Sequence, residues 1–309
     1  MRLITTLSIL IISSLGLSGC GGDYQAERLM WEARQESRFI QGDPKLVPAE
    51  AWENVVQAYQ KVLDKAPGSK LAAQAQFNIA TVYLRQLDLE KAREAYGKVL
   101  QNYSKDRRLS SEAYFIIGRT HELENHWDKA VESYENLVLY YGDTLKGLQV
   151  PIYIAEGYKR RGQIEEARAA YEKALKGYDK RAEDSSSGNF KAHAYGFKAW
   201  AYESEGDWAN ALNTHMSVAN EYPESDRAPL SLFTAALIYQ QKFQDMDRAV
   251  QLYKTLLSRY PKHRLTQFAI LQVRSYEEQG ALKDLSVSPA DVDSTRNLEM
   301  KTTDENPGS

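Results

Sequence analysis

Cysteine and histidine are scarce in this sequence, and their scarcity excludes several kinds of site. The 309 residues include one cysteine and five histidines. No disulfide can therefore form within the chain, and no cluster of cysteine and histidine is available for a structural zinc site. Phosphate-binding and dinucleotide-binding glycine motifs and a nucleophile elbow are also missing. The sequence predicts a protein that is not an enzyme, with no cofactor and no small-molecule substrate.

An excess of charge of one sign is missing as well. The formal net charge is −3, and both signs are mixed along the chain. No global field would attract nucleic acid, so we expect no nucleic-acid partner. Only 9 prolines and 18 glycines are present, while alanine, tyrosine, glutamate, lysine and leucine are plentiful. That composition is typical of a helical protein whose partners are selected by local surface features.

The one long apolar run lies at the amino terminus. Residues 3–17 are mostly apolar and follow a single basic residue, Arg2, which is typical of a secretory signal and too short for a membrane-spanning helix. The run ends in Leu-Ser-Gly-Cys at residues 17–20, which resembles the lipobox of bacterial lipoproteins. The resemblance implies that residues 1–19 are removed and that Cys20 is acylated. The alternative is an ordinary cleaved signal with an incidental cysteine.

An acylated Cys20 implies a membrane anchor. Each buried methylene of an acyl chain contributes about 0.8 kcal/mol, so several chains make the attachment effectively permanent. The residue after the cysteine is Gly21 and not an aspartate, which in enterobacterial lipoproteins implies export to the outer membrane. We therefore expect an outer-membrane protein facing the periplasm. Residues 20–23 are interpreted as a short lipidated leash.

A short motif recurs through the rest of the chain, with an alanine four residues before an aromatic residue or histidine. The alanines lie 38, 37, 44 and 38 residues apart. They are Ala92, Ala130, Ala167, Ala211 and Ala249, and their partners are Tyr96, Tyr134, Tyr171, His215 and Tyr253. We attribute the longest step to an insert rich in serine and glycine at residues 184–188. Proline after a unit, as at Pro223 and Pro261, predicts a helix end, and a period of this length predicts repeated helix pairs.

Each repeat is expected to contain two antiparallel helices that bury one apolar stripe each. Small residues at a fixed place in the first helix let the helix axes approach closely, namely Ala80, Gly118, Ala155, Ala199 and Ala236. This pattern resembles the tetratricopeptide repeat. The resemblance implies an all-α fold, a right-handed superhelical solenoid of about six tetratricopeptide-like helix-turn-helix repeats over residues 24–280. Apolar periodicity then stops, and residues 281–309 are expected to form a disordered polar tail.

The Tyr-Pro endings of the repeats, as in residues 221–225, also resemble those of outer-membrane lipoproteins of the BamD type, whose repeats scaffold the assembly of β-barrel proteins. The resemblance implies a non-catalytic, membrane-anchored periplasmic scaffold that is a subunit of a larger complex. The alternative is a structural lipoprotein that links the membrane to the cell wall, to pilus or secretion machinery, or to polysaccharide export machinery. The sequence does not separate the two.

The repeat alignment predicts a groove that binds envelope proteins or peptides. In a superhelix of this kind the first helix of each pair lines the concave face, and aromatic and arginine side chains dominate binding hot spots. The predicted partner-binding residues are Phe77, Phe115, Arg119, Glu122, Glu156, Lys159, Trp200 and Phe233. The alternative for each aromatic residue is packing against neighbouring helices.

The positions of the histidines in the sequence do not point to a metal site. His121 and His126 are five residues apart, across a helix and the turn after it, so we expect them on different faces and predict no metal site. His215 takes the place of the repeat tyrosine and is expected to be a packed core residue.

Overall fold

The computed structural model describes residues 18–285, with side chains over residues 24–278, and this part of the chain contains helices and turns but no strand. Residues 1–17 and 286–309, most of the predicted signal peptide and tail, lie outside it. Residues 20–23, expected to form a leash, instead belong to the first helix, and the last helix runs to Leu285, past the predicted start of the tail. No helix within residues 18–285 combines the length and apolar character needed to cross a bilayer.

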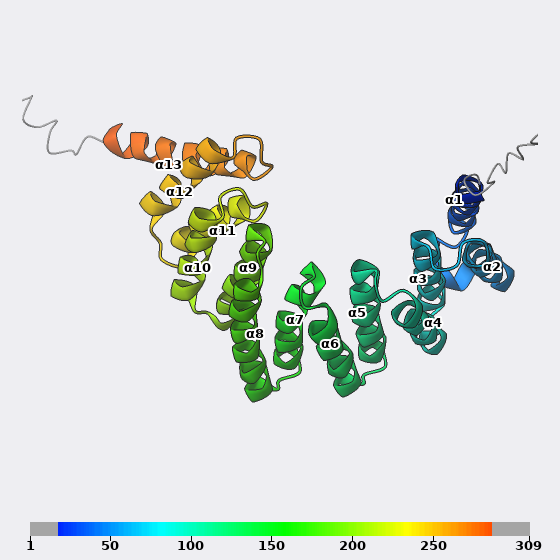
Figure 1. Ribbon diagram of the computed structural model, residues 1–309. Coiled ribbons are helices and arrows are strands. Elements are labelled where there is room, and N and C mark those ends of the chain that lie inside the picture. The colour runs from blue at the N-terminus through cyan, green and yellow to red at the C-terminus, as the bar shows by residue number, and fades with distance from the viewer. Residues whose placement is uncertain (1–17, 286–309) are drawn as a thin grey trace, which may run out of the picture. The chain divides into compact units, whose positions relative to one another are not determined.

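Thirteen α-helices follow one another along residues 18–285, mostly joined by short turns (Figure 1). A 3-10 helix, η1 (Pro44–Leu46), lies in the longer loop between the first two helices. The helices are α1 (Ser18–Glu36), α2 (Ala49–Lys65), α3 (Lys70–Arg85), α4 (Leu89–Asn102), α5 (Arg107–Leu123), α6 (Trp127–Tyr141), α7 (Leu145–Arg160), α8 (Ile164–Asp184), α9 (Gly188–Glu205), α10 (Trp208–Glu221), α11 (Ala228–Gln241), α12 (Met246–Arg259) and α13 (Thr266–Leu285). The predicted all-α fold of helix-turn-helix repeats is confirmed.

The helices divide between two compact units, residues 1–171 and 172–309, and α8 crosses the division. We call α3, α5, α7, α9 and α11 the A helices, and α4, α6, α8, α10 and α12 the B helices. Prolines 223 and 261 follow the ends of α10 and α12, as expected. The longest spacing between motif alanines, from Ala167 to Ala211, was attributed to an insert at residues 184–188. In the structure the extra residues lie in α8, which is 21 residues long.

Burial confirms the repeat register. The five motif alanines of the B helices are at most 3% exposed. The small residues of the A helices are buried as well. An added Cβ at Gly118 would overlap the ring of Tyr134, and one at Gly157 would overlap the ring of Trp127. The large rings thus fill the space that the small residues leave.

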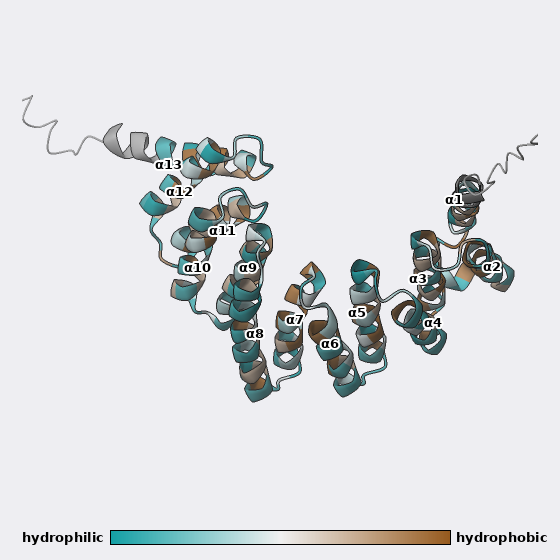
Figure 2. Ribbon diagram, viewed as in Figure 1, coloured by the Kyte–Doolittle hydropathy of each residue, from teal (hydrophilic) through white to brown (hydrophobic). Residues whose placement is uncertain are grey.

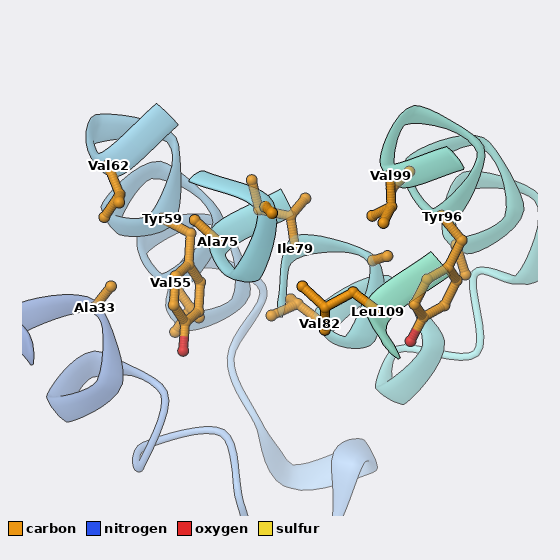
Figure 3. Close-up of a cluster of buried hydrophobic side chains, with 14 of the residues drawn as sticks. Ala33, Val55, Tyr59, Val62, Ala75, Ile79, Val82, Tyr96, Val99 and Leu109 are labelled. Atoms are coloured by element: carbon orange, nitrogen blue, oxygen red, sulfur yellow. The ribbon is translucent and has the colours of Figure 1, made fainter. Parts of the chain in front are cut away.

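The first unit contains one buried apolar cluster that extends from α1 to α5 and another that joins α6 and α7. Val55, Tyr59 and Val62 of α2 lie toward Ala75 and Ile79 of α3 (Figure 3). Apolar residues occupy one side of most helices and charged residues the other, so brown and teal segments alternate along the helices in Figure 2. Within each unit, successive helix pairs therefore bury their apolar stripes by stacking on one another, as in other repeat proteins.

The turn inside each helix pair follows one plan. The second residue before the B helix has a positive φ, and these residues are Leu87 (61°), Asn125 (62°), Gly162 (75°), Gly206 (79°) and Gln244 (54°). In three of the pairs the next residue is an aspartate whose side chain accepts a hydrogen bond from a backbone N–H of the first turn; these are Asp88, Asp207 and Asp245. The turn therefore reverses the chain in a similar way in each pair.

Candidate functional site

The B helices present one ring each to the A helix of the same pair. These rings are buried, with exposed fractions from 0% to 3%, and each ends in a polar atom that is hydrogen-bonded to an A-helix side chain. The pairs are Tyr96 with Thr81 (3.0 Å), Tyr134 with Glu122 (3.2 Å), Tyr171 with Glu156 (2.6 Å), His215 with Glu203 (2.6 Å) and Tyr253 with Gln240 (3.0 Å). The core thus positions polar groups on the A helices, and His215 is the core residue expected from the sequence.

These buried phenols predict a loss of stability in alkali. Burial raises the pKa of Tyr96 and of Tyr253 to about 12 from an ordinary value of 10.0. A raised pKa in the folded state means that the contribution to stability is complete below pH 10 and is lost as pH rises toward 12. We expect the denaturation midpoint to fall between pH 9 and pH 11.5, and to fall less in Tyr96→Phe. Equal midpoints at both pH values in the wild type would contradict this expectation.

The predicted groove phenylalanines belong partly to the core. Phe77, Phe115 and Phe233 are half-buried. Their ring centroids lie 5.1 Å from Tyr96, 5.5 Å from Tyr134 and 5.7 Å from Tyr253, respectively. Each ring therefore packs against the B helix and leaves part of its surface open, so helix packing is observed and partner binding stays a prediction. Trp200 is more open, at 39% exposed.

The predicted charged residues divide into two kinds. Arg119 and Lys159 are exposed, whereas Glu122 has a side chain only 14% exposed. Glu122 accepts hydrogen bonds from Tyr134 and, at 2.9 Å, from Tyr153, and its other neighbour is Arg119 at 3.4 Å. Glu122 is therefore a fixed acceptor, whereas Arg119 and Lys159 lie at the surface.

Helices α5 and α7 together form the best defined part of this surface. Lys146 Nζ lies 4.2 Å from the ring centroid of Phe115, and the guanidinium groups of Arg119 and Arg160 lie 5.9 and 5.6 Å from that of Tyr153. We call Phe115, Arg119, Glu122, Lys146, Tyr153 and Arg160 the α5–α7 face. Lys146 and Tyr153 were not predicted, because their contacts with Phe115 join one repeat to the next. Arg160 was also not predicted, and it contacts Tyr153 of its own helix.

His121 and His126, which were not expected to form a metal site, lie close together. Ligand atoms of His121, Glu124 and His126 are all within 4.8 Å of one another. The two histidines do not share a helical face, as expected, but they still come together because the turn after α5 folds His126 back onto the end of that helix. His121 lies in the last turn of α5, whereas His126 is the residue just before α6 and follows the reversal at Asn125.

Comparison with known families agrees with this geometry. A family model described as "Tetratricopeptide repeat" matches residues 74–106, 112–144 and 230–263, and a second model of the same description matches residues 154–176. The chain carries tetratricopeptide repeats. The matches fall on α3/α4, α5/α6, α7/α8 and α11/α12. Tetratricopeptide repeats are protein-interaction scaffolds that present extended binding surfaces.

Several solved structures are similar to the chain. BtubC (BKLC) from P. vanneervenii is 17% identical over 77% of this chain and 93% of its own, with a TM-score of 0.43. YrrB, described as a TPR protein with an unusual peptide-binding site, is 17% identical over 69% and 98%, with a TM-score of 0.34. Pseudomonas aeruginosa pilF is 16% identical over 84% and 99%, with a TM-score of 0.37. No curated protein matches the chain significantly.

Proposed function

We propose that this chain is a non-catalytic, lipid-anchored scaffold of the bacterial envelope that binds a partner polypeptide on its A helices. The observation that carries the proposal is the α5–α7 face, where cations lie over aromatic rings that the core holds in place. Arg119 and Arg160 are exposed, whereas the Lys146 side chain is only 22% exposed and is paired with Glu112. Aromatic and arginine side chains in fixed positions lose little conformational freedom on binding and so make effective hot spots.

The α5–α7 face suits a partner segment with both acidic and apolar side chains. Its exposed cations can meet carboxylates, and the open edges of Phe115 and Tyr153 can receive an apolar side chain. Glu122 already has three partners, so it serves as a rigid support instead of a free charge. Truncating such a support would disturb the core, which makes Arg119 the better residue to test.

The membrane anchor is the second part of the proposal and rests on the Leu-Ser-Gly-Cys sequence at residues 17–20. Acylation of Cys20 would hold the repeats at the outer membrane, facing the periplasm, as part of a larger complex. The finer assignment is a BamD-like role in the assembly of β-barrel proteins, supported by the Tyr-Pro repeat endings. A structural lipoprotein that links the membrane to cell-wall, pilus, secretion or polysaccharide export machinery is the second candidate.

Loss of the cysteine tests the anchor. In cells labelled with a palmitate analogue, Cys20→Ser is expected to lose the label and to leave the precursor unprocessed, because the thiol is the acceptor. An equal label in mutant and wild type would show that Cys20 is not the attachment site. A normally cleaved but unlabelled wild-type protein would favour the ordinary signal peptide.

Truncation of exposed A-helix residues tests partner binding. We expect Arg119→Ala combined with Trp200→Ala to reduce crosslinking to the main partner by tenfold or more, since hot-spot truncations commonly cost 2 kcal/mol or more. The melting temperature should be unchanged, because Arg119 is exposed and Trp200 partly so. The readout is quantitative mass spectrometry after crosslinking in intact cells.

A matched control replaces exposed residues of the B helices. Tyr140 is 56% exposed on α6, and the side chain of Arg168 is 61% exposed on α8. Tyr140→Ala combined with Arg168→Ala should leave crosslinking intact. If this control loses the partner and the A-helix double variant keeps it, the binding surface lies on the B helices. The identity of the recovered partner, a β-barrel assembly core or another envelope machine, decides between the two candidate functions.

A further inference from the structure

The helix pair α5/α6 departs from the other pairs at two positions. The first is three residues after the small residue of the A helix, where α5 has His121 and the other A helices have Tyr83, Tyr158, Tyr202 and Tyr239. The second is the residue before the B helix, where α6 has His126 and the equivalent residues include Asp88, Asp207 and Asp245. Two of the five histidines of the chain therefore occur together, each in place of a residue that recurs in the other repeats.

The second departure removes a stabilising contact. Each of the three aspartates caps its helix, whereas His126 makes no side-chain hydrogen bond to the first turn of α6. A good N-cap contributes about 1 kcal/mol. Breaking a local rule of this kind without a visible structural gain is typical of a functional position.

The turn brings both histidines to one carboxylate. The His126 backbone N–H donates to the His121 carbonyl oxygen at 2.8 Å, and Asn125 between them has a φ of 62°. As a result, His121 Nδ1 lies 3.9 Å and His126 Nδ1 lies 3.6 Å from Oε2 of Glu124. His121 Nδ1 is also buried and has no hydrogen-bond partner. An unsatisfied buried nitrogen is costly unless a ligand satisfies it.

We propose that His121, Glu124 and His126 bind a divalent transition-metal ion, with Zn²⁺ as the best matched. Two imidazoles and a carboxylate form a donor set that zinc uses in proteins. In a tetrahedral site with bonds of about 2.1 Å, ligand atoms are about 3.4 Å apart. The two imidazoles lie 3.6 and 3.9 Å from Glu124 Oε2, and all three ligand atoms lie within 4.8 Å of one another. Side-chain rotations would bring them to the tetrahedral spacing. The fourth position faces solvent, because the side chain of His126 is 55% exposed.

Arg93 of α4 decides how strongly the site can bind. Its guanidinium donates to both oxygens of Glu124, at 2.8 and 3.1 Å. A carboxylate has about four lone-pair positions, so two remain for a metal, and an outer partner of this kind orients the ligand. The positive charges of Arg93 and of nearby Lys129 oppose a cation. We therefore expect micromolar affinity for Zn²⁺, weaker than in a closed structural site.

Titration of the full chain with Zn²⁺ tests this proposal. The protein is purified without a histidine tag, treated with EDTA, exchanged into metal-free buffer and titrated with zinc chloride in a calorimeter. We expect one ion per chain. His121→Tyr and His126→Asn are each expected to weaken binding at least tenfold. Both variants introduce residues suited to those positions, since tyrosine recurs in the other A helices and asparagine is a good N-cap.

Two further variants show whether Zn²⁺ binds at the cluster or elsewhere on the chain. His263 lies outside the cluster, so His263→Gln should bind Zn²⁺ as the wild type does. Zinc should also raise the melting temperature of the wild type and of His263→Gln but not that of His121→Tyr. Glu124→Gln, which preserves side-chain size, is measured if either histidine variant loses helix content. Absence of stoichiometric binding, or binding that survives loss of each of the three ligands, would overturn the proposal.

Discussion

Replacing Tyr134 with alanine is expected to lower the free energy of unfolding by about 3–5 kcal/mol, as for other large buried aromatic residues. The side chain is fully buried. Its ring centroid lies 5.5, 6.4 and 5.4 Å from those of Phe115, Trp127 and Tyr153. Removal would leave a cavity between α5, α6 and α7 and would take away the hydrogen-bond donor to Glu122.

Urea denaturation followed by circular dichroism measures this effect, and Tyr140→Ala is the matched control. Tyr140 lies on the same helix but is 56% exposed, so its truncation should change stability by no more than about 0.5 kcal/mol. Similar effects of the two substitutions would mean that the register of α6 is wrong. Partner crosslinking should fall in Tyr134→Ala only to the extent that the protein unfolds.

Substitution of alanine for Gly147 is expected to cost about 3 kcal/mol, the upper end for overpacking. Gly147 lies in the first turn of α7, and an added Cβ would overlap the carbonyl oxygen of Tyr141. It would also come within 2.6 Å of the Gly142 Cα. These are backbone atoms of the turn between α6 and α7, so no side-chain rotation can relieve the overlap.

Gly97→Ala is the matched control and should raise the stability of the protein, whereas Gly147→Ala should lower it. Gly97 lies inside α4, and a Cβ there would meet nothing within 4 Å. Alanine should therefore stabilise the helix by about 0.5–1 kcal/mol, since glycine is the poorer helix former. The two denaturation midpoints should move in opposite directions. A destabilising Gly97→Ala, or a neutral Gly147→Ala, would contradict the packing described for these helices.

The candidate site was predictable only in part. The repeat alignment placed Phe115 and Arg119 on the A-helix face, because that choice depends on helical periodicity alone. It did not anticipate that Phe115 also packs against Tyr134, because one ring can contact the core with one edge and solvent with the other. Lys146 and Tyr153 were missed because they come from the following repeat, and the offset between neighbouring repeats is not encoded by spacing within one of them.

The sequence by itself determined the helical class, the helix pairs and the buried positions of this protein. Those features follow from local periodicity, from proline and capping residues at helix ends, and from small residues at fixed places in each repeat. Only the tertiary structure decided which side chains meet across a turn or between repeats. His121 and His126 are the clearest case, because a single residue with a positive φ, Asn125, reverses the chain and brings both imidazoles to Glu124.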